Sequence, residues 1–251
     1  MSTIEIKYIF SAGFRCNSPD TLKRFGLRPF SGPFDYLFID IESVFKLIDL
    51  KMSPFLHDIV VFNKNKQQNY FLNKLNDLNN KKVCYMSHDY NNIDLRINTN
   101  FLDDNLPGNL YDWDKICIFH HHDIIDKNTY EVISKRVDRF NKIMETDYEK
   151  TCLFHITKIL TIPDIHEYMN SIIRLKLLYS IHSYIIVIAC CDNLENTHQF
   201  KENCLFIFKK VSPYNNQIKE GQGTDNNLDF TYEINIMKNF FSFNLVSLSE
   251  I

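Results

Sequence analysis

One cysteine of this chain lies in the segment Ser11–Asp20, "SAGFRCNSPD", between an alternating apolar run and an amphipathic run. This pattern predicts a turn between a strand and a helix, with Cys16 close to the start of the helix. The positive end of the helix dipole and the charge of Arg15 favour the thiolate form of such a cysteine. Cys16 is therefore a candidate nucleophile, and the alternative is a surface or half-buried cysteine without chemistry.

A thiolate nucleophile needs a neighbouring imidazole as base, and the imidazole needs a partner that fixes its tautomer. Two histidine clusters follow short strand-like runs, and each joins an imidazole to a carboxylate. Either cluster can supply the base and the orienting acid. The candidates are His88 with Asp89 in the first cluster, and His120 and His122 with Asp123 in the second. The alternative for each histidine is a structural hydrogen bond in a loop. His155 lies inside a strand-like run, so we expect a structural role for it.

The second histidine cluster is also a candidate metal site. On a strand, His120 and His122 point to one face, whereas His121 points to the other. No HExxH spacing and no pair of closely spaced cysteines accompanies them. We therefore predict no metal site and no cofactor.

Arg136 and Arg139 are spaced by one turn of a predicted helix. Such a pair can hold a phosphate or carboxylate group, and it can equally pair with acidic residues such as Asp138 or Glu145. GxGxxG and GxxxxGK[ST] motifs are absent, which counts against dinucleotide-binding and P-loop proteins.

The composition is that of a globular protein, with 45% hydrophobic and 24% charged residues among 251. A formal net charge of −3 gives no electrostatic footprint for nucleic acid or for an anionic membrane. The start of the chain lacks a signal-peptide pattern, and no apolar run is long enough to span a bilayer. Seven cysteines without CxxC spacing favour a reducing compartment without disulfides, so we expect a cytoplasmic protein. The Asn-, Ile- and Lys-rich composition is typical of AT-rich coding, as in a large DNA virus, where the location would be the host cytoplasm or the virion.

Strands are predicted to alternate with helices along the chain. The strand-like runs are 4–10, 83–86, 116–119, 151–156, 184–189 and 204–208, and the helical runs are 19–26, 41–50, 129–144 and 163–180. A polar loop at 209–227 and a closing helix at about 229–241 follow. This alternation predicts a single α/β domain over residues 1–251, with a mostly parallel central sheet flanked by helices.

Taken together, these motifs resemble a family described as "putative papain-like cysteine peptidase", found in bacteria and large DNA viruses. The residues that carry the resemblance are "SAGFRC" at 11–16 and "GLRPFSGPFDY" at 26–36, followed by His88-Asp89 and Arg139-Phe140. Tyr36 replaces the Trp of the family motif, and His155 stands where the family tends to have Arg. The resemblance implies thiol chemistry at Cys16. With it, we count Arg15, Asp35, Arg136 and Arg139 as candidate substrate-binding residues.

Three functions remain open from the sequence. The first is a cysteine hydrolase, with Cys16 as nucleophile and a histidine base, acting on a peptide or another acyl substrate. The second is a glycan-modifying transferase that binds a nucleotide-sugar through its arginines. The third is a binding module without catalytic activity. The sequence does not identify the substrate or the oligomeric state.

Overall fold

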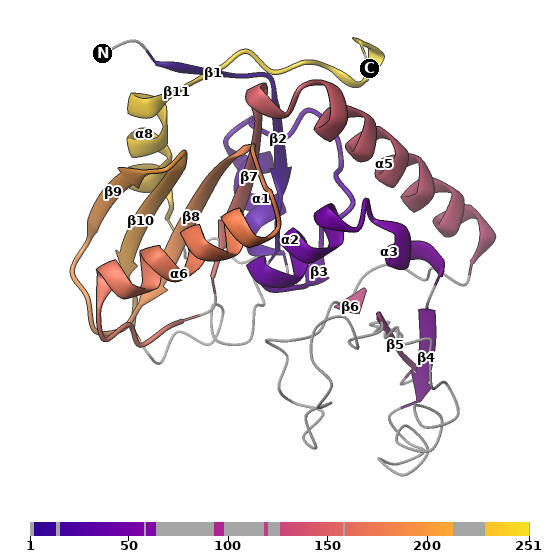
Figure 1. Cartoon of the computed structure of the whole chain (residues 1–251), viewed down its shortest axis with the longest axis horizontal. Coiled ribbons are helices and arrows are strands. Elements are labelled where there is room, and N and C mark those ends of the chain that lie inside the picture. The colour runs from indigo at the N-terminus through magenta and orange to yellow at the C-terminus, as the bar shows by residue number, and fades with distance from the viewer. Residues whose placement is uncertain are drawn as a thin grey trace.

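A five-stranded sheet forms the centre of the structure, a computed structural model (Figure 1) that describes residues 3–13, 16–57, 59–63, 93–97, 118–119, 126–157, 159–212 and 229–250. The strand order is β2-β7-β8-β10-β9, in which the first four strands are parallel and β9 is antiparallel to β10. The bounds are β2 (Tyr8–Ser11), β7 (Thr151–Ile156), β8 (Tyr184–Cys191), β9 (Thr197–Lys201) and β10 (Cys204–Lys210). The predicted α/β fold with a mostly parallel sheet is confirmed.

The inner strands of this sheet are continuous apolar runs because both of their faces are covered. All six residues of β7 are buried, as are seven of the eight residues of β8. The edge strand β9 alternates between half-buried and exposed residues, as expected where one face is open to solvent.

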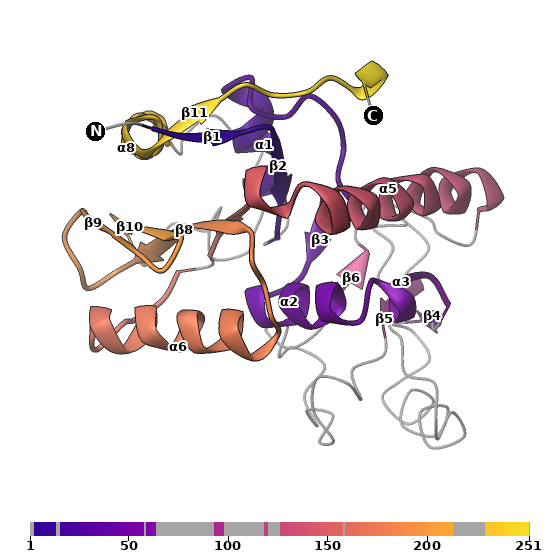
Figure 2. The ribbon, with the colours of Figure 1, turned by 45° about the horizontal axis from the view of Figure 1, so that its top comes forward.

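Helices cover both faces of the sheet (Figure 2). On one face lie α2 (Ile41–Asp49), α5 (Lys127–Thr146) and α6 (Ile165–Leu178), whose apolar residues share one core with alternate residues of the strands. On the other face lie α1 (Asn17–Arg24) and α8 (Thr231–Phe240), which pack in a second core. The short helix α3 (Ser53–His57) follows α2.

Three aspartates start the helices of the first face. The side chain of Asp40 accepts the N–H of Ser43 at 2.7 Å at the start of α2, and Asp126 caps α5 in the same way at 2.8 Å. Asp164 accepts two N–H groups at the start of α6. Each cap satisfies N–H groups that have no partner within the helix.

Two smaller sheets complete the described structure. β1 (Ile4–Ile6) pairs in parallel with β11 (Phe241–Phe243), so a segment near the start of the chain lies beside one near its end. An antiparallel sheet has the order β3-β6-β5-β4 and consists of β3 (Leu37–Phe38), β6 (Ile118–Phe119), β5 (Ile93–Ile97) and β4 (Ile59–Asn63). Two single 3₁₀ turns are at Tyr148–Lys150 and Leu248–Glu250.

Some predicted boundaries are wrong. The single strand expected over residues 4–10 is two strands, because the chain turns at Lys7, whose N–H donates to the Lys150 carbonyl at 2.9 Å. β10 continues to Lys210, two residues into the predicted polar loop, and residues 213–227 of that loop lie outside the described residues. The predicted strand at 83–86 lies outside them too. That residues 1–251 form one domain stays a prediction.

Among the described residues, no helix is both long and apolar enough to cross a membrane.

Candidate active site

The turn after β2 determines where the chain can place Cys16. The N–H of Ala12 donates to the Phe154 carbonyl at 2.8 Å and so extends the pairing with β7. Gly13 then adopts a φ of 78°, and a Cβ atom at this position would lie 2.4 Å from the carbonyl oxygen of Ile39. Glycine is the residue that fits both the left-handed backbone and the close approach.

Cys16 is the N-cap residue of α1. Its φ of −75° and ψ of −18° lie in the right-handed helical region, and its carbonyl accepts the N–H of Asp20 at 3.0 Å. The helix predicted to start at residue 19 therefore starts two residues earlier, at Asn17. The first N–H groups of a helix have no intrahelical partner, so Pro19 is tolerated in the third position as well as in the first.

Ser18 instead connects the turn to the neighbouring strand. Its hydroxyl donates to the Gly13 carbonyl and accepts the N–H of Ile156, the last residue of β7, at 2.9 Å. The Ser18 side chain is fully buried, so both bonds are shielded from water. They hold the start of α1 against the carboxyl end of β7.

The surroundings of Cys16 are buried and polar. Cys16 is 7% exposed and Asn17 is 3% exposed. Among the described residues, the Nδ2 atom of Asn17 and the hydroxyl of Ser11 are buried without a hydrogen-bond partner. Such groups cost about 1–3 kcal/mol each when they stay unpaired. The turn therefore has unused hydrogen-bonding capacity on both sides of Cys16 in the chain.

His155, on β7, contacts the same turn from within the sheet. Its Nδ1–H donates to the Ala12 carbonyl at 2.7 Å, and the side chain is 4% exposed. Burial lowers the pKa of His155 to about 4, although the Ala12 and Gly13 carbonyls oppose this shift. The imidazole is neutral at pH 7 with its lone pair on Nε2. The structural role expected for this histidine is consistent with that bond.

Six of the residues predicted for the site lie outside the described residues. They are Arg15, His88, Asp89, His120, His122 and Asp123. Which of these histidines serves Cys16 stays a prediction.

The loop that follows α1 contains a buried ion pair. Nε of Arg28 donates to Oδ2 of Asp35 at 2.9 Å, and a second nitrogen of the same guanidinium reaches that oxygen. The N–H of Gly32 donates to it as well, at 2.9 Å. Although burial opposes the charge of Arg28, the Asp35 carboxylate holds the pKa of the guanidinium above its ordinary value. Asp35 is 1% exposed, so this pair fixes the fold of the loop.

Tyr36 connects this loop to α1. Its hydroxyl donates to Oδ1 of Asp20 at 3.0 Å, and Nη1 of Arg28 lies 3.4 Å from the Tyr36 oxygen. Asp20 follows Cys16 by four residues and therefore lies on the same face of α1. Tyr36 has a φ of 63°, which is unusual for a large side chain and common where a loop is constrained for function.

Arg136 and Arg139 of α5 face this loop. Nη2 of Arg139 donates to the Ser31 carbonyl at 2.8 Å, and its guanidinium lies 4.8 Å from the centre of the Phe30 ring. Arg136 is close enough to Asp35 for the two charges to interact. The alternative pairing with Glu145 is not found, since that side chain bonds to Lys51 at 3.2 Å. The structure thus brings Asp35, Arg136 and Arg139 together, as candidates for one site.

The described cysteines other than Cys16 belong to the two cores. Cys152, Cys190, Cys191 and Cys204 have exposures of 0%, and burial raises the pKa of each thiol, to about 12 for Cys191 and about 11 for Cys204. Within the described part of the chain, no three His, Cys, Asp or Glu residues are grouped so that they could hold a metal ion.

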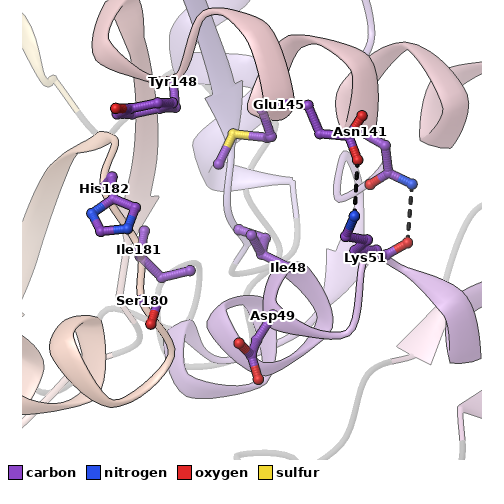
Figure 3. A pocket seen from close by; sticks show the side chains of 10 residues that line it. Ile48, Asp49, Lys51, Asn141, Glu145, Tyr148, Ser180, Ile181 and His182 are labelled. Carbon is purple, nitrogen blue, oxygen red and sulfur yellow. Dashed lines mark hydrogen bonds and ion pairs between the residues drawn. The ribbon is translucent and has the colours of Figure 1, made fainter.

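Two cavities lie away from these residues. One, of about 180 Å³, is lined by residues of α2, α5 and the segments that follow them, and by the segment before β8 (Figure 3). In it the Lys51–Glu145 pair and the bond from Asn141 to the Lys51 carbonyl form one wall, opposite His182. The other, of about 320 Å³, follows the carboxyl end of β7 between Leu160 and Ser171. Of the predicted site residues that the structure describes, none lines either cavity.

Comparison with known proteins gives a family for this chain. No curated protein and no solved structure matches it. A family model matches residues 7–184, which is more than half of the chain and contains the Cys16 turn, the loop with Asp35 and the arginines of α5. The chain belongs to the family described as "putative papain-like cysteine peptidase".

Proposed function

We propose that this protein is a thiol-dependent hydrolase in which Cys16 is the nucleophile. The observation that carries the proposal is the position of Cys16, at the N-terminus of α1 and just beyond the carboxyl end of β2. Ligands of open α/β sheets bind at this edge, and a helix N-terminus favours a thiolate. The description of the family supports the same general chemistry.

The proposed reaction has two steps. A histidine takes the proton of the Cys16 thiol, and the thiolate attacks the carbonyl carbon of a peptide or another acyl substrate. The bond to the leaving group breaks, and that group departs with the proton held by the imidazole. Water then attacks the thioester, which releases the acid and restores the thiol.

Donors for the developing oxyanion are available at the start of α1. The first N–H groups of a helix have no partner within the helix, and they point toward its N-terminus. The Nδ2 atom of Asn17 is a further candidate, because it is buried without a partner.

For the base we propose His88, His120 or His122, with Asp89 or Asp123 as the orienting carboxylate. His155 does not suit this role, because a pKa of about 4 makes it a weak base at neutral pH. We assign it to positioning, since its bond to the Ala12 carbonyl holds the turn that carries Cys16.

The test is the alkylation rate of Cys16 by iodoacetamide, followed residue by residue with peptide mass spectrometry between pH 5 and pH 9. We expect Cys16 to react faster than a free thiol at pH 7. Cys204, which is 0% exposed and whose pKa burial raises to about 11, should react slowly. A Cys16→Ala variant should lose both this labelling and hydrolysis of acyl substrates, whereas Cys191→Ser keeps them. A Cys16 rate no higher than that of a free thiol would contradict the proposal.

The base is then identified by single substitutions. His88→Ala, His120→Ala and His122→Ala are compared for the pH profile of Cys16 alkylation. Loss of the base should move the midpoint of the rise in one alkylation profile toward the pKa of an isolated thiol, about 8.5. If all three profiles coincide with that of the unmodified protein, none of these histidines serves Cys16.

A further inference from the structure

The group formed by Arg28, Arg136, Arg139 and Asp35 carries more positive than negative charge. Each of the three guanidinium groups interacts electrostatically with Asp35, and Arg136 also interacts unfavourably with Arg28 and Arg139. Three positive charges and one negative charge leave a net charge of +2. A second acid, Asp20, interacts electrostatically with Arg28 but is not among the groups that act on Arg136 or Arg139.

Asp35 is already engaged by Arg28 and the backbone. Its Oδ2 atom accepts two hydrogen bonds from the Arg28 guanidinium and one from Gly32. The excess charge therefore resides on the two arginines of α5. Partly buried charges without a counter-charge are destabilising, and proteins seldom keep them without a partner.

The hydrogen-bonding groups of these two arginines are also incompletely used. Nη1 of Arg136 and Nε of Arg139 are buried without a partner among the described residues. Burial lowers the pKa of both guanidinium groups. The positive charge of Arg136 lowers the pKa of Arg139 further. Each side chain is nevertheless only half-buried, so part of it remains open to solvent.

The two arginines differ in how they are held. Arg139 is fixed by the Ser31 carbonyl at 2.8 Å and by the face of Phe30. Arg136 makes no hydrogen bond to the described part of the chain, and its guanidinium can turn toward a ligand without breaking one. The two residues, one helical turn apart, thus provide one guanidinium group in a fixed position and one that can reorient toward a ligand.

We propose that Arg136 and Arg139 form a binding site for a dianionic phosphate group. A phosphate group balances the net charge of +2 and has enough oxygens to accept hydrogen bonds from both guanidinium groups. A carboxylate balances only one charge, and one guanidinium group supplies the two hydrogen bonds that it accepts. Phosphate binding at these arginines does not depend on the thiol chemistry of Cys16.

The experiment measures thermal unfolding and isothermal titration of the full chain with inorganic phosphate, at constant ionic strength maintained with chloride. Acetate is the carboxylate probe in a parallel titration. The variants are Arg136→Gln and Arg139→Gln, and the matched control is Lys135→Gln, an exposed cation on the same helix.

Phosphate should raise the unfolding temperature of the unmodified protein and of Lys135→Gln, and acetate should do so much less. Arg136→Gln should bind phosphate at least about tenfold more weakly. In phosphate-free buffer, however, it should unfold at the same or a higher temperature than the unmodified protein, because an unbalanced charge has been removed. Cys16→Ala should bind phosphate normally, which separates this proposal from the proposed hydrolase.

Three results would overturn the inference. They are no phosphate-dependent stabilisation, equal phosphate binding by Arg136→Gln and the unmodified protein, and acetate binding as tight as phosphate binding, which would assign a carboxylate ligand. A lower unfolding temperature of Arg136→Gln in phosphate-free buffer would also overturn it, since it would show that Arg136 is a structural residue already balanced by the protein.

Discussion

Between β2 and α1 the described polar groups that the turn buries are neutral, whereas the loop 26–36 buries charged groups. The turn is held by the Ser18 hydroxyl and by the His155 imidazole, each of which bonds to backbone atoms. The loop is held by one carboxylate, Asp35, which accepts three hydrogen bonds from Arg28 and Gly32. The two regions meet at α1, where Tyr36 bonds to Asp20.

This difference has energetic consequences. Hydrogen bonds between neutral groups contribute about 0.5–1.5 kcal/mol each, so loss of one weakens the turn locally. A buried ion pair contributes little net stability while intact, but removal of one partner leaves the other charge buried alone. The loop should therefore be much more sensitive to a single substitution than the turn, and the turn should respond mainly to protonation of its imidazole.

The largest effect is expected for Asp35→Asn, which keeps the shape of the side chain and removes its charge. Three guanidinium groups would then lie together without a carboxylate, and the free energy of unfolding should fall by about 3–5 kcal/mol. Urea unfolding followed by circular dichroism measures it. Asp138→Asn, an exposed acid on α5, is the control and should stay within about 0.5 kcal/mol. A loss from Asp35→Asn as small as that of the control would show that the loop does not depend on this charge.

Protonation of His155 should have the next largest effect. The folded-state pKa of about 4 lies below the unfolded value of about 6.5, so the unfolded chain binds the proton more tightly. The contribution of His155 is complete above pH 6.5 and is lost as the pH falls toward 4. It amounts to about 3 kcal/mol between pH 7 and pH 4.

The measurement compares unfolding free energies of the unmodified protein and of His155→Gln at each pH. The difference between them should change by this amount over the interval, because the variant lacks the titrating group. Parallel pH profiles for the two proteins would mean that His155 is not held neutral in the folded state.

The central sheet could be predicted closely from the sequence. The apolar runs of β7, β8 and β10 differ from the predicted segments by at most two residues, because a strand buried on both faces leaves a clear local signal. The division of the first predicted strand into β1 and β2 left no such signal. β1 pairs with β11, at the other end of the chain, and local periodicity does not encode a partner that distant.

The local positions of the candidate site residues could be predicted from the sequence, but the contacts between distant segments could not. The strand-turn-helix pattern placed Cys16 near a helix start, and the spacing of Arg136 and Arg139 placed both on one helix face. The contact of these arginines with the loop 26–36 joins segments about a hundred residues apart, so no local pattern predicts it. The bond from His155 to Ala12 depends on the pairing of Ser11 with Phe154, and sequence alone does not specify that register.

The smallest effect is expected for alanine substitutions of Gly13 and Gly26, which separate the cost of backbone strain from the cost of a steric clash. Gly13 and Gly26 have φ values of 78° and 69°, so an alanine at either position is strained by a similar amount, about 1 kcal/mol. At Gly26 a Cβ atom would meet open space, whereas at Gly13 it would lie 2.4 Å from the Ile39 carbonyl oxygen. Gly13→Ala should therefore lower the free energy of unfolding by about 2 kcal/mol or more, and Gly26→Ala by about 1 kcal/mol.

Because the turn positions Cys16, Gly13→Ala should also slow iodoacetamide alkylation of that thiol, while Gly26→Ala leaves the rate unchanged. The pair of variants thus tests whether the close contact between the turn and Ile39 positions the sulfur or only stabilises the fold. Equal alkylation rates at a reduced stability of Gly13→Ala would restrict the contact to folding. Equal stabilities of the two variants would show that the backbone moves away from Ile39 at no cost. The turn, which is held by neutral groups, would then tolerate a substitution better than the loop, which is held by a charged group.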